Sequence, residues 1–90
     1  MRLVWRAKAR RDAENIVRFI ADRDPAAAER IGQLINSAVA LILTHPHMYR
    51  AGRLLDTREA VIHPNYIIVY RVTGDSVVIL AVLHARQNYP

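Results

Sequence analysis

The sequence has no cysteine among its 90 residues, only three glycines and a single lysine. Without cysteine, neither a disulfide framework nor a cysteine-ligated zinc or iron–sulfur site can form. The absence of cysteine is typical of proteins in a reducing compartment, so we expect a cytoplasmic protein. The glycines are isolated, which excludes a glycine-rich phosphate-binding loop. No apolar run approaches the roughly 18 residues of a membrane span, so no contact with a membrane is expected.

The residues that are abundant favour a small folded domain with a basic surface. Hydrophobic residues make up 52% of the chain, and 13 Lys and Arg outnumber 8 Asp and Glu to give a formal charge of +5. One domain over residues 1–90 is expected. A chain this short has little left for a deep pocket once its core is built, so we expect no cofactor and a function at the surface. The positive charge favours an acidic partner, although it could serve only solubility.

The first half of the chain shows a strand pattern followed by two helical patterns. Residues 2–6 alternate as a short strand does, and residues 8–22 place their apolar side chains on one helical face. A second helix is predicted over about residues 25–44, with Asp24 as its cap. We expect Gly32 to let the first helix approach the second closely. The two helices form an antiparallel hairpin that needs a flat surface to cover.

The second half changes to the two-residue period of strands. Residues 57–63, 66–73 and 76–84 are predicted strands, residues 47–56 a loop, and residues 74–75 a hairpin turn with glycine first. Three such strands form an antiparallel meander. The fold class is therefore α+β in the order β-α-α-β-β-β, with the helical hairpin packed on one face of a small, mainly antiparallel sheet.

The hairpin register assigns side chains to the two faces of the sheet. With Thr73 opposite Ser76, one face is predicted to carry Ile67, Val69, Arg71, Val78, Leu80, Val82 and His84, continuing to Arg86. The opposite face is also largely apolar, and one helical hairpin covers only one of them. We therefore expect the Ile67 face to bind a partner, unless loop and terminal segments of the chain fold over it.

The histidines are candidates for metal or catalytic groups. His45 and His47 have no third ligand nearby, so no metal site is expected. His84 lies at the end of the last predicted strand, with Arg86 just beyond. Such a pair could perform acid/base chemistry on a phosphodiester. The alternative is that the His84 ring hydrogen-bonds locally and ends the strand.

Several short sequence segments together resemble those of the RelE/ParE superfamily of toxins from bacterial type II toxin–antitoxin modules. The resemblance covers nearly the whole chain, and it is carried by His45-Pro46, Thr57-Arg58-Glu59, residues 66–72, residues 82–87 and terminal Tyr89-Pro90. It implies the same β-α-α-β-β-β fold. It also implies a cognate antitoxin that wraps the toxin with a helix and an extended segment, and operator DNA bound only through that antitoxin.

Two activities divide this superfamily. RelE-like toxins cut mRNA on the ribosome without a metal, whereas ParE-like toxins inhibit DNA gyrase. RelE-like nucleases typically have an arginine two residues before a Val-Tyr pair, and that position here is Ile67. We therefore favour a non-enzymatic gyrase inhibitor. The alternative is a ribosome-dependent mRNA endonuclease, for which His84, Arg86 and Tyr89 are the candidate catalytic residues.

The resemblance also names an occupant for the second apolar face. It implies that the antitoxin covers a set of apolar and basic side chains there, namely Ile67, Val69, Arg71, Leu80, Val82, His84 and Arg86.

Overall fold

The computed structural model describes residues 1–89 of the chain. Its elements are β1 (Arg2–Trp5), α1 (Ala7–Ala21), α2 (Pro25–Thr44), β2 (Arg50–Ala51), β3 (Arg58–His63), β4 (Tyr66–Thr73) and β5 (Ser76–His84). The predicted α+β class and element order are confirmed. The segment 47–56, predicted to be a loop, contains the additional two-residue strand β2, which pairs antiparallel with the start of β3.

Helix α2 begins where the sequence predicts it. The Asp24 side chain accepts a hydrogen bond from the backbone N–H of Ala27 at 3.1 Å, and Pro25 occupies the first turn, where no intrahelical donor is needed. By length and composition alone α2 could cross a membrane, contrary to our expectation that no segment is long and apolar enough. In this fold, however, its buried side chains, among them Ile35 and Ile42, belong to the core beneath the sheet.

Gly32 has no packing role within the chain, contrary to our expectation. Apart from its chain neighbours and the backbone of α2 itself, a Cβ atom built at this position meets nothing within 4 Å, so the packing of α1 does not require a glycine there. A glycine inside a helix destabilises it by roughly 0.5–1 kcal/mol relative to alanine. The chain therefore carries this cost without a compensating contact of its own.

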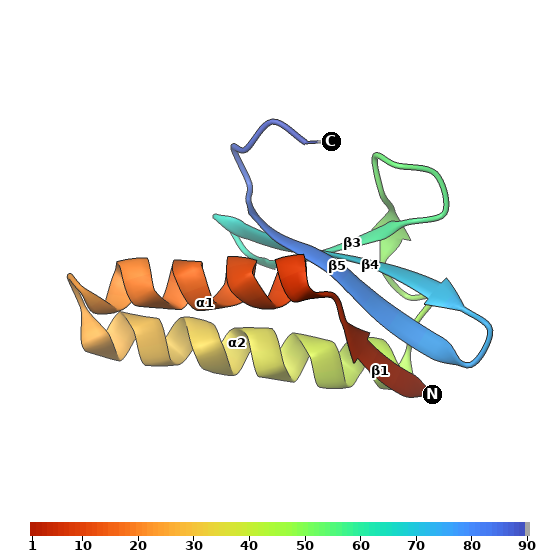
Figure 1. Cartoon of the computed structure of the whole chain (residues 1–90), viewed down its shortest axis with the longest axis horizontal. Helices are drawn as coiled ribbons and strands as arrows, with labels where there is room; N and C mark the ends of the chain where they lie inside the picture. Colours follow the sequence, from red (N-terminus) through yellow and green to blue (C-terminus); the bar gives the residue numbers. More distant parts are fainter. Residues whose placement is uncertain (90) are drawn as a thin grey trace.

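The strands form one sheet in the order β1-β5-β4-β3-β2. Strand β1 pairs parallel with β5, and the other neighbours are antiparallel. Helices α1 and α2 lie side by side on one face, with α1 against β5 and α2 against β3, while the C-terminal segment lies on the opposite side (Figure 1). The main core lies between the helices and the sheet, and its largest fully buried side chains are Tyr70, Ile42, Ile68, Ile79 and Val77.

The β4–β5 hairpin follows the predicted register near its turn and departs from it further along. Gly74 has a φ of +56°, as the two-residue turn requires, and Arg71 lies opposite Val78. The register then shifts, because Tyr70 pairs with Ile79 whereas Val69 pairs with Ala81, leaving Leu80 as the extra residue of a β-bulge.

The bulge corrects the predicted faces. From Ala81 onward every side chain of β5 changes sides, because the side-chain period of a strand is two. Val82 belongs to the core beneath the helices, and His84 lines a hollow beside α1, so neither lies on the face with Ile67. Ala81 and Leu83 take their places.

The second face of the sheet is also closed at its centre, which corrects the expectation of an open apolar surface. Ile67, Val69, Ala81 and Leu83 are buried there as a second cluster. Leu80, Ala85 and Tyr89 pack against it, so the chain's own C-terminal segment forms the cover.

Candidate functional site

The His84 ring makes a local hydrogen bond at the end of its strand, which is the alternative to a catalytic role that the sequence left open. The backbone N–H of Arg86 donates a hydrogen bond to Nδ1 of His84 at 3.1 Å, which turns the chain at the end of β5. The ring meets Tyr66 edge-on, with the ring centroids 5.6 Å apart. Both side chains line a hollow of about 300 Å³, together with Asp12 of α1. The Asp12 carboxylate accepts a hydrogen bond from the backbone N–H of Val82 at 3.1 Å.

The three residues proposed as a nuclease set are not brought together. Arg86 is exposed, and Tyr89 packs on the second face of the sheet, opposite the helical side on which His84 lies. The Tyr89 carbonyl accepts a hydrogen bond from Nη1 of Arg53 at 3.1 Å, and the Arg53 guanidinium carbon lies 5.7 Å from the Tyr89 ring centroid. Tyr89 therefore anchors the C-terminal segment rather than facing His84.

A buried carboxylate that the sequence analysis did not select supports this arrangement. Glu59 is 3% exposed and accepts hydrogen bonds from the backbone N–H of Arg53 at 2.9 Å and from Nη2 of Arg50 at 3.2 Å. Nε of Arg53 lies 3.3 Å from the same carboxylate. Glu59 thus fixes the segment after β2, and Arg53 links it to Tyr89. The pattern of a glutamate in a strand preceded by two nearby arginines was visible in the sequence, but not its pairing.

Two further basic side chains meet where β4 extends past β3. Arg71 and Arg58 line a hollow of about 460 Å³ together with Asp56. Within residues 1–89, Nε of Arg71 is buried and has no hydrogen-bond partner. Nη1 of Arg58 donates to the carbonyl of Tyr49 at 2.7 Å. Arg71, a basic residue of the predicted partner-binding set, keeps its predicted place on the second face, in alternation with Ile67 and Val69.

Tyr70 occupies the core below this hollow. Its hydroxyl donates a hydrogen bond to the carbonyl of Pro46 at 2.6 Å, and the Tyr49 ring packs edge-on against it. Burial raises the pKa of the Tyr70 hydroxyl above its ordinary value, an effect that the nearby positive charge of Arg58 opposes. Tyr70 is therefore a structural anchor for the segment that follows α2.

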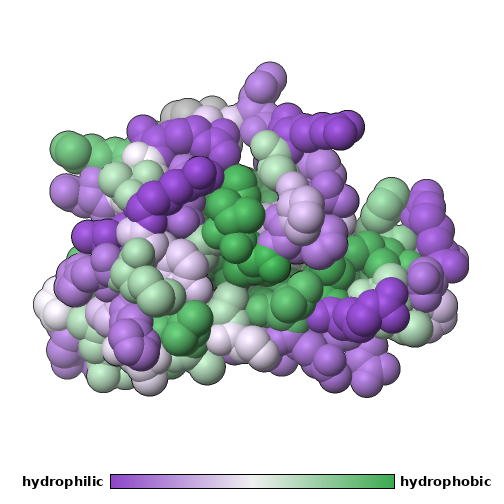
Figure 2. Space-filling view, turned by 180° about the vertical axis from the view of Figure 1, so that it is seen from behind, coloured by the Kyte–Doolittle hydropathy of each residue, from purple (hydrophilic) through white to green (hydrophobic). Residues whose placement is uncertain are grey.

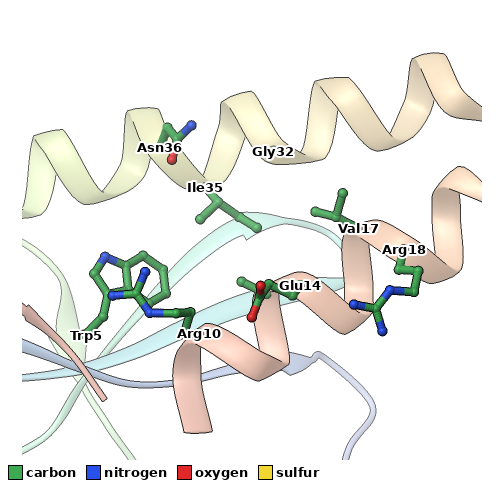
Figure 3. A pocket seen from close by; sticks show the side chains of 9 residues that line it. Trp5, Arg10, Glu14, Val17, Arg18, Gly32, Ile35 and Asn36 are labelled. Atoms are coloured by element: carbon green, nitrogen blue, oxygen red, sulfur yellow. The ribbon is translucent and has the colours of Figure 1, made fainter. Parts of the chain in front are cut away.

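A groove of about 510 Å³ lies between the two helices. Its lining comes from β1, α1 and α2, and Figure 3 shows Ile35 of α2 pointing toward α1, with Trp5 near the start of α1. The residues of this groove were not predicted from the sequence to form a site. The one available signal was a glycine in the middle of an otherwise regular helical pattern.

Exposed apolar side chains are spread over several elements. Leu55 is 86% exposed, Val61 52% and Val4 39%, and the space-filling view from behind shows an apolar hollow bordered by hydrophilic side chains (Figure 2). Within residues 1–89 no three His, Asp or Glu side chains are grouped so as to hold a metal ion.

Comparison with known proteins decides the family. The family model described as the ParE toxin of the type II toxin–antitoxin system parDE matches residues 3–89. The chain belongs to this ParE toxin family. It is also 40% identical over 90 residues to the putative toxin Y4kP of Sinorhizobium fredii, covering 99% of this chain and 93% of that one. It is 32% identical over 84 residues to toxin RelE1 of Caulobacter vibrioides, covering 90% and 89% of the two chains. The predicted superfamily is confirmed.

Solved structures agree with the fold of this ParE-family toxin. A chain of the chromosomal ParDE system from P. aeruginosa superposes with a TM-score of 0.81 at 22% identity, covering 93% of the toxin and 95% of that chain. The YoeB/ParE toxin from Agrobacterium tumefaciens gives a TM-score of 0.68 at 20% identity, covering 93% and 98%. At these identities the likeness concerns the fold alone.

Proposed function

We propose that this type II toxin acts in the cytoplasm as an inhibitor of DNA gyrase and is neutralised by a cognate antitoxin. The choice of gyrase over mRNA as the target rests on the identity and burial of Ile67. It occupies the position at which RelE-like nucleases typically have an arginine, and it is 4% exposed within the second-face cluster. A buried isoleucine offers no charge to a phosphodiester. Removing one such stabilising group costs about 3–4 kcal/mol of transition-state stabilisation.

The positions of the remaining nuclease candidates support the same choice. A catalytic acid or base must reach the same reacting phosphate as the group that stabilises its charge. His84 lies on the helical side with Nδ1 already accepting a hydrogen bond, whereas Tyr89 lies on the second face against Arg53. No single ligand position serves both rings in this arrangement.

The alternative is a ribosome-dependent mRNA endonuclease. Two curated relatives, toxins RelE1 and RelE3 of Caulobacter vibrioides, are each 32% identical to this chain and carry the RelE name. Arg86 also matches the C-terminal arginine of the nuclease pattern and is exposed. The target then would be mRNA bound in the ribosome.

An antitoxin partner is favoured by the family and by the charge. The matched family and the similar P. aeruginosa chain both belong to ParDE toxin–antitoxin systems, and a formal charge of +5 attracts an acidic partner. Operator DNA is proposed to be contacted only through that antitoxin. Of the predicted contact residues, Arg71, Leu80 and Arg86 are at least partly accessible. Ile67 and Val69 become accessible only if residues 85–89 are displaced.

The decisive experiment compares two activities of the purified toxin. We expect it to inhibit supercoiling by purified gyrase and to leave ribosome-bound mRNA intact. In cells, DNA synthesis should then stop before translation does. Cleavage of mRNA on ribosomes, abolished by Arg86→Ala or His84→Ala while supercoiling is unaffected, would instead establish the nuclease alternative. Normal growth on expression without antitoxin would contradict both.

A further inference from the structure

Arg71 has a buried hydrogen-bond donor that no other part of residues 1–89 satisfies. Its Nε is buried and has no partner, and the ion pairs of these residues do not include Arg71. The side chain lines the hollow of about 460 Å³ at the end of the sheet, where β4 continues past the pair of Arg58 with Tyr70. A buried donor without an acceptor destabilises the fold, which points to an acceptor supplied by a partner.

The hollow around Arg71 is positively charged. Arg58 lines it as well, and its Nη1 donates to the backbone carbonyls of His47 and Tyr49 at 3.1 and 2.7 Å. Asp56 also lines the hollow, but no ion pair joins it to either arginine in the described part of the chain. Two guanidinium groups against one carboxylate suit a further carboxylate, which can accept hydrogen bonds from both.

The loop between β2 and β3 stands beside this hollow and is held in one shape. It projects from the sheet on the side opposite the helices (Figure 1). The Gly52 N–H donates to the Thr57 carbonyl at 2.7 Å, and the Thr57 hydroxyl donates to the Leu54 carbonyl at 2.7 Å. A Cβ atom on Gly52 would collide with the Thr57 hydroxyl, so the loop closes this tightly only with a glycine there. The buried Glu59 carboxylate fixes the loop from inside through the Arg53 amide.

The tip of this loop presents a leucine. Leu55 is 86% exposed, and it is followed by Asp56, whose φ of +61° is uncommon for a residue other than glycine. Asp56 and Thr57 also line the Arg71 hollow, so the leucine and the hollow are adjacent parts of one surface. An apolar side chain on a loop that is already ordered loses little conformational freedom when a partner binds it.

We propose that Leu55 and the Arg71 hollow form the contact with the target protein, which is gyrase under the function proposed above. Leu55 enters an apolar pocket of the target, and a carboxylate beside that pocket accepts hydrogen bonds from Arg71 and Arg58. The inference rests on the proposed function and adds the surface that performs it.

The shape of this surface favours a folded partner. A protruding leucine is buried only by a concave apolar pocket, and such pockets are built by folded domains rather than by short peptide segments. An apolar anchor with charged groups beside it is an arrangement in which a few residues provide most of the binding free energy of an interface. The antitoxin is the competing occupant, and its binding is measured separately.

The first test removes the apolar tip. Leu55→Gln exchanges the exposed leucine for a polar side chain of similar length, and Leu55→Met restores an apolar one. Leu41→Gln makes the same exchange on α2, where Leu41 is 42% exposed. Purified gyrase is the probe for the target, and the product of the reading frame upstream of the toxin is the probe for antitoxin binding.

The contact predicts a loss that is specific to the target. We expect Leu55→Gln to raise the toxin concentration that half-inhibits supercoiling at least about tenfold, and the other two variants to stay within about threefold of the wild type. Leu55→Gln should bind the antitoxin as the wild type does. It should also unfold at the same temperature, because the leucine is almost fully exposed.

The second test removes the unsatisfied donor. Arg71→Met keeps the apolar stem of the side chain. We expect it to weaken binding to gyrase at least about tenfold in low salt and to flatten the dependence of binding on salt, since a charge–charge contact is lost. Its unfolding temperature should not fall, because the Nε donor has no partner to lose.

Each outcome supports or overturns the inference. Inhibition by Leu55→Gln at the wild-type concentration overturns it and leaves the proposed function intact. Failure of the wild type to inhibit gyrase overturns both. Loss of antitoxin binding in Leu55→Gln would assign the loop to the antitoxin and also overturn the inference. Unchanged affinity and salt dependence in Arg71→Met would refute the part played by the hollow.

Discussion

Removing the Glu59 carboxylate should loosen two segments at once. Its oxygens accept hydrogen bonds from the Arg53 backbone and from Arg50, and Arg53 in turn donates to the Tyr89 carbonyl. Glu59→Ala therefore leaves the Arg53 amide without its acceptor. It also releases the guanidinium that holds the C-terminal segment over the second face.

The expected loss of unfolding free energy depends on how exposed each partner of Glu59 is. A hydrogen bond from a backbone N–H to a buried carboxylate contributes about 1.5–3 kcal/mol. The side chains of Arg50 and Arg53 are 60% and 37% exposed, so water takes over much of their solvation when the carboxylate is removed. Their ion pairs then contribute only about 0.5 kcal/mol each. We expect Glu59→Ala to lower the free energy of unfolding by about 2.5–4 kcal/mol.

Two variants separate the carboxylate from its exposed partners. Glu59→Gln keeps an acceptor for the Arg53 amide and should cost about half as much as Glu59→Ala. Arg50→Ala removes only an exposed partner and should cost under about 1 kcal/mol. Urea unfolding measures all three, and hydrogen exchange at the Gln87 amide, which donates to the His84 carbonyl at 2.9 Å, reports release of the C-terminal segment. Equal costs for Glu59→Gln and Glu59→Ala, or unaltered exchange in Glu59→Ala, would refute the reasoning.

Three further changes test the core and its anchors. Tyr70→Phe removes the hydrogen bond to Pro46 and should lower the free energy of unfolding by about 1 kcal/mol at neutral pH. Because burial raises the pKa of Tyr70 above 10.0, its contribution is fully present below pH 10 and is lost as the pH rises through the folded-state pKa, so urea midpoints of wild type and variant should converge in alkali. Asp24→Ala removes the α2 cap and should cost about 1 kcal/mol, measured by thermal unfolding; no loss would show that the cap contributes nothing. Ile42→Ala empties a fully buried site and should cost about 2–5 kcal/mol in the same assay, whereas a cost below about 1 kcal/mol would contradict the burial.

The sequence predicts the elements well because their boundaries carry local chemistry. Asp24 with Pro25 marks the start of α2, and Gly74 with its positive φ fixes the turn and the first pairs of the last hairpin. These signals act over a few residues, so no knowledge of the tertiary fold is needed to interpret them.

The bulge at Leu80 could not be predicted, for a physical reason. A register slip is visible in a sequence only when it would move apolar side chains into water. Here both faces of β4 and β5 are apolar, so a one-residue shift exchanges Val82 for Leu83 without an apparent penalty. The predicted placement of Val82 and His84 on the same face as Ile67 is wrong for this reason.

The parts of the surface that depend on distant segments were also hidden. Tyr89 is held over the second face by a hydrogen bond from Arg53, and Arg53 is held in turn by its ion pair with Glu59. These three residues come together only in the folded chain. The groove combines Trp5 with residues of both helices. The helix-interior Gly32 suggests a packing role because the sequence does not show that its neighbourhood is empty.

The pairing of β1 with β5 sets the order in which the chain can complete its structure. Arg2 lies beside Ser76, so the first strand has no neighbour until the last one has been made. The hydrogen bond from the Val82 amide to the Asp12 carboxylate likewise can form only after residue 82 has been synthesised. The helical hairpin depends mainly on near contacts, and its formation can precede the sheet. The sheet of this toxin therefore stays incomplete until β5 has been synthesised, and an antitoxin can meet the chain before the sheet has formed.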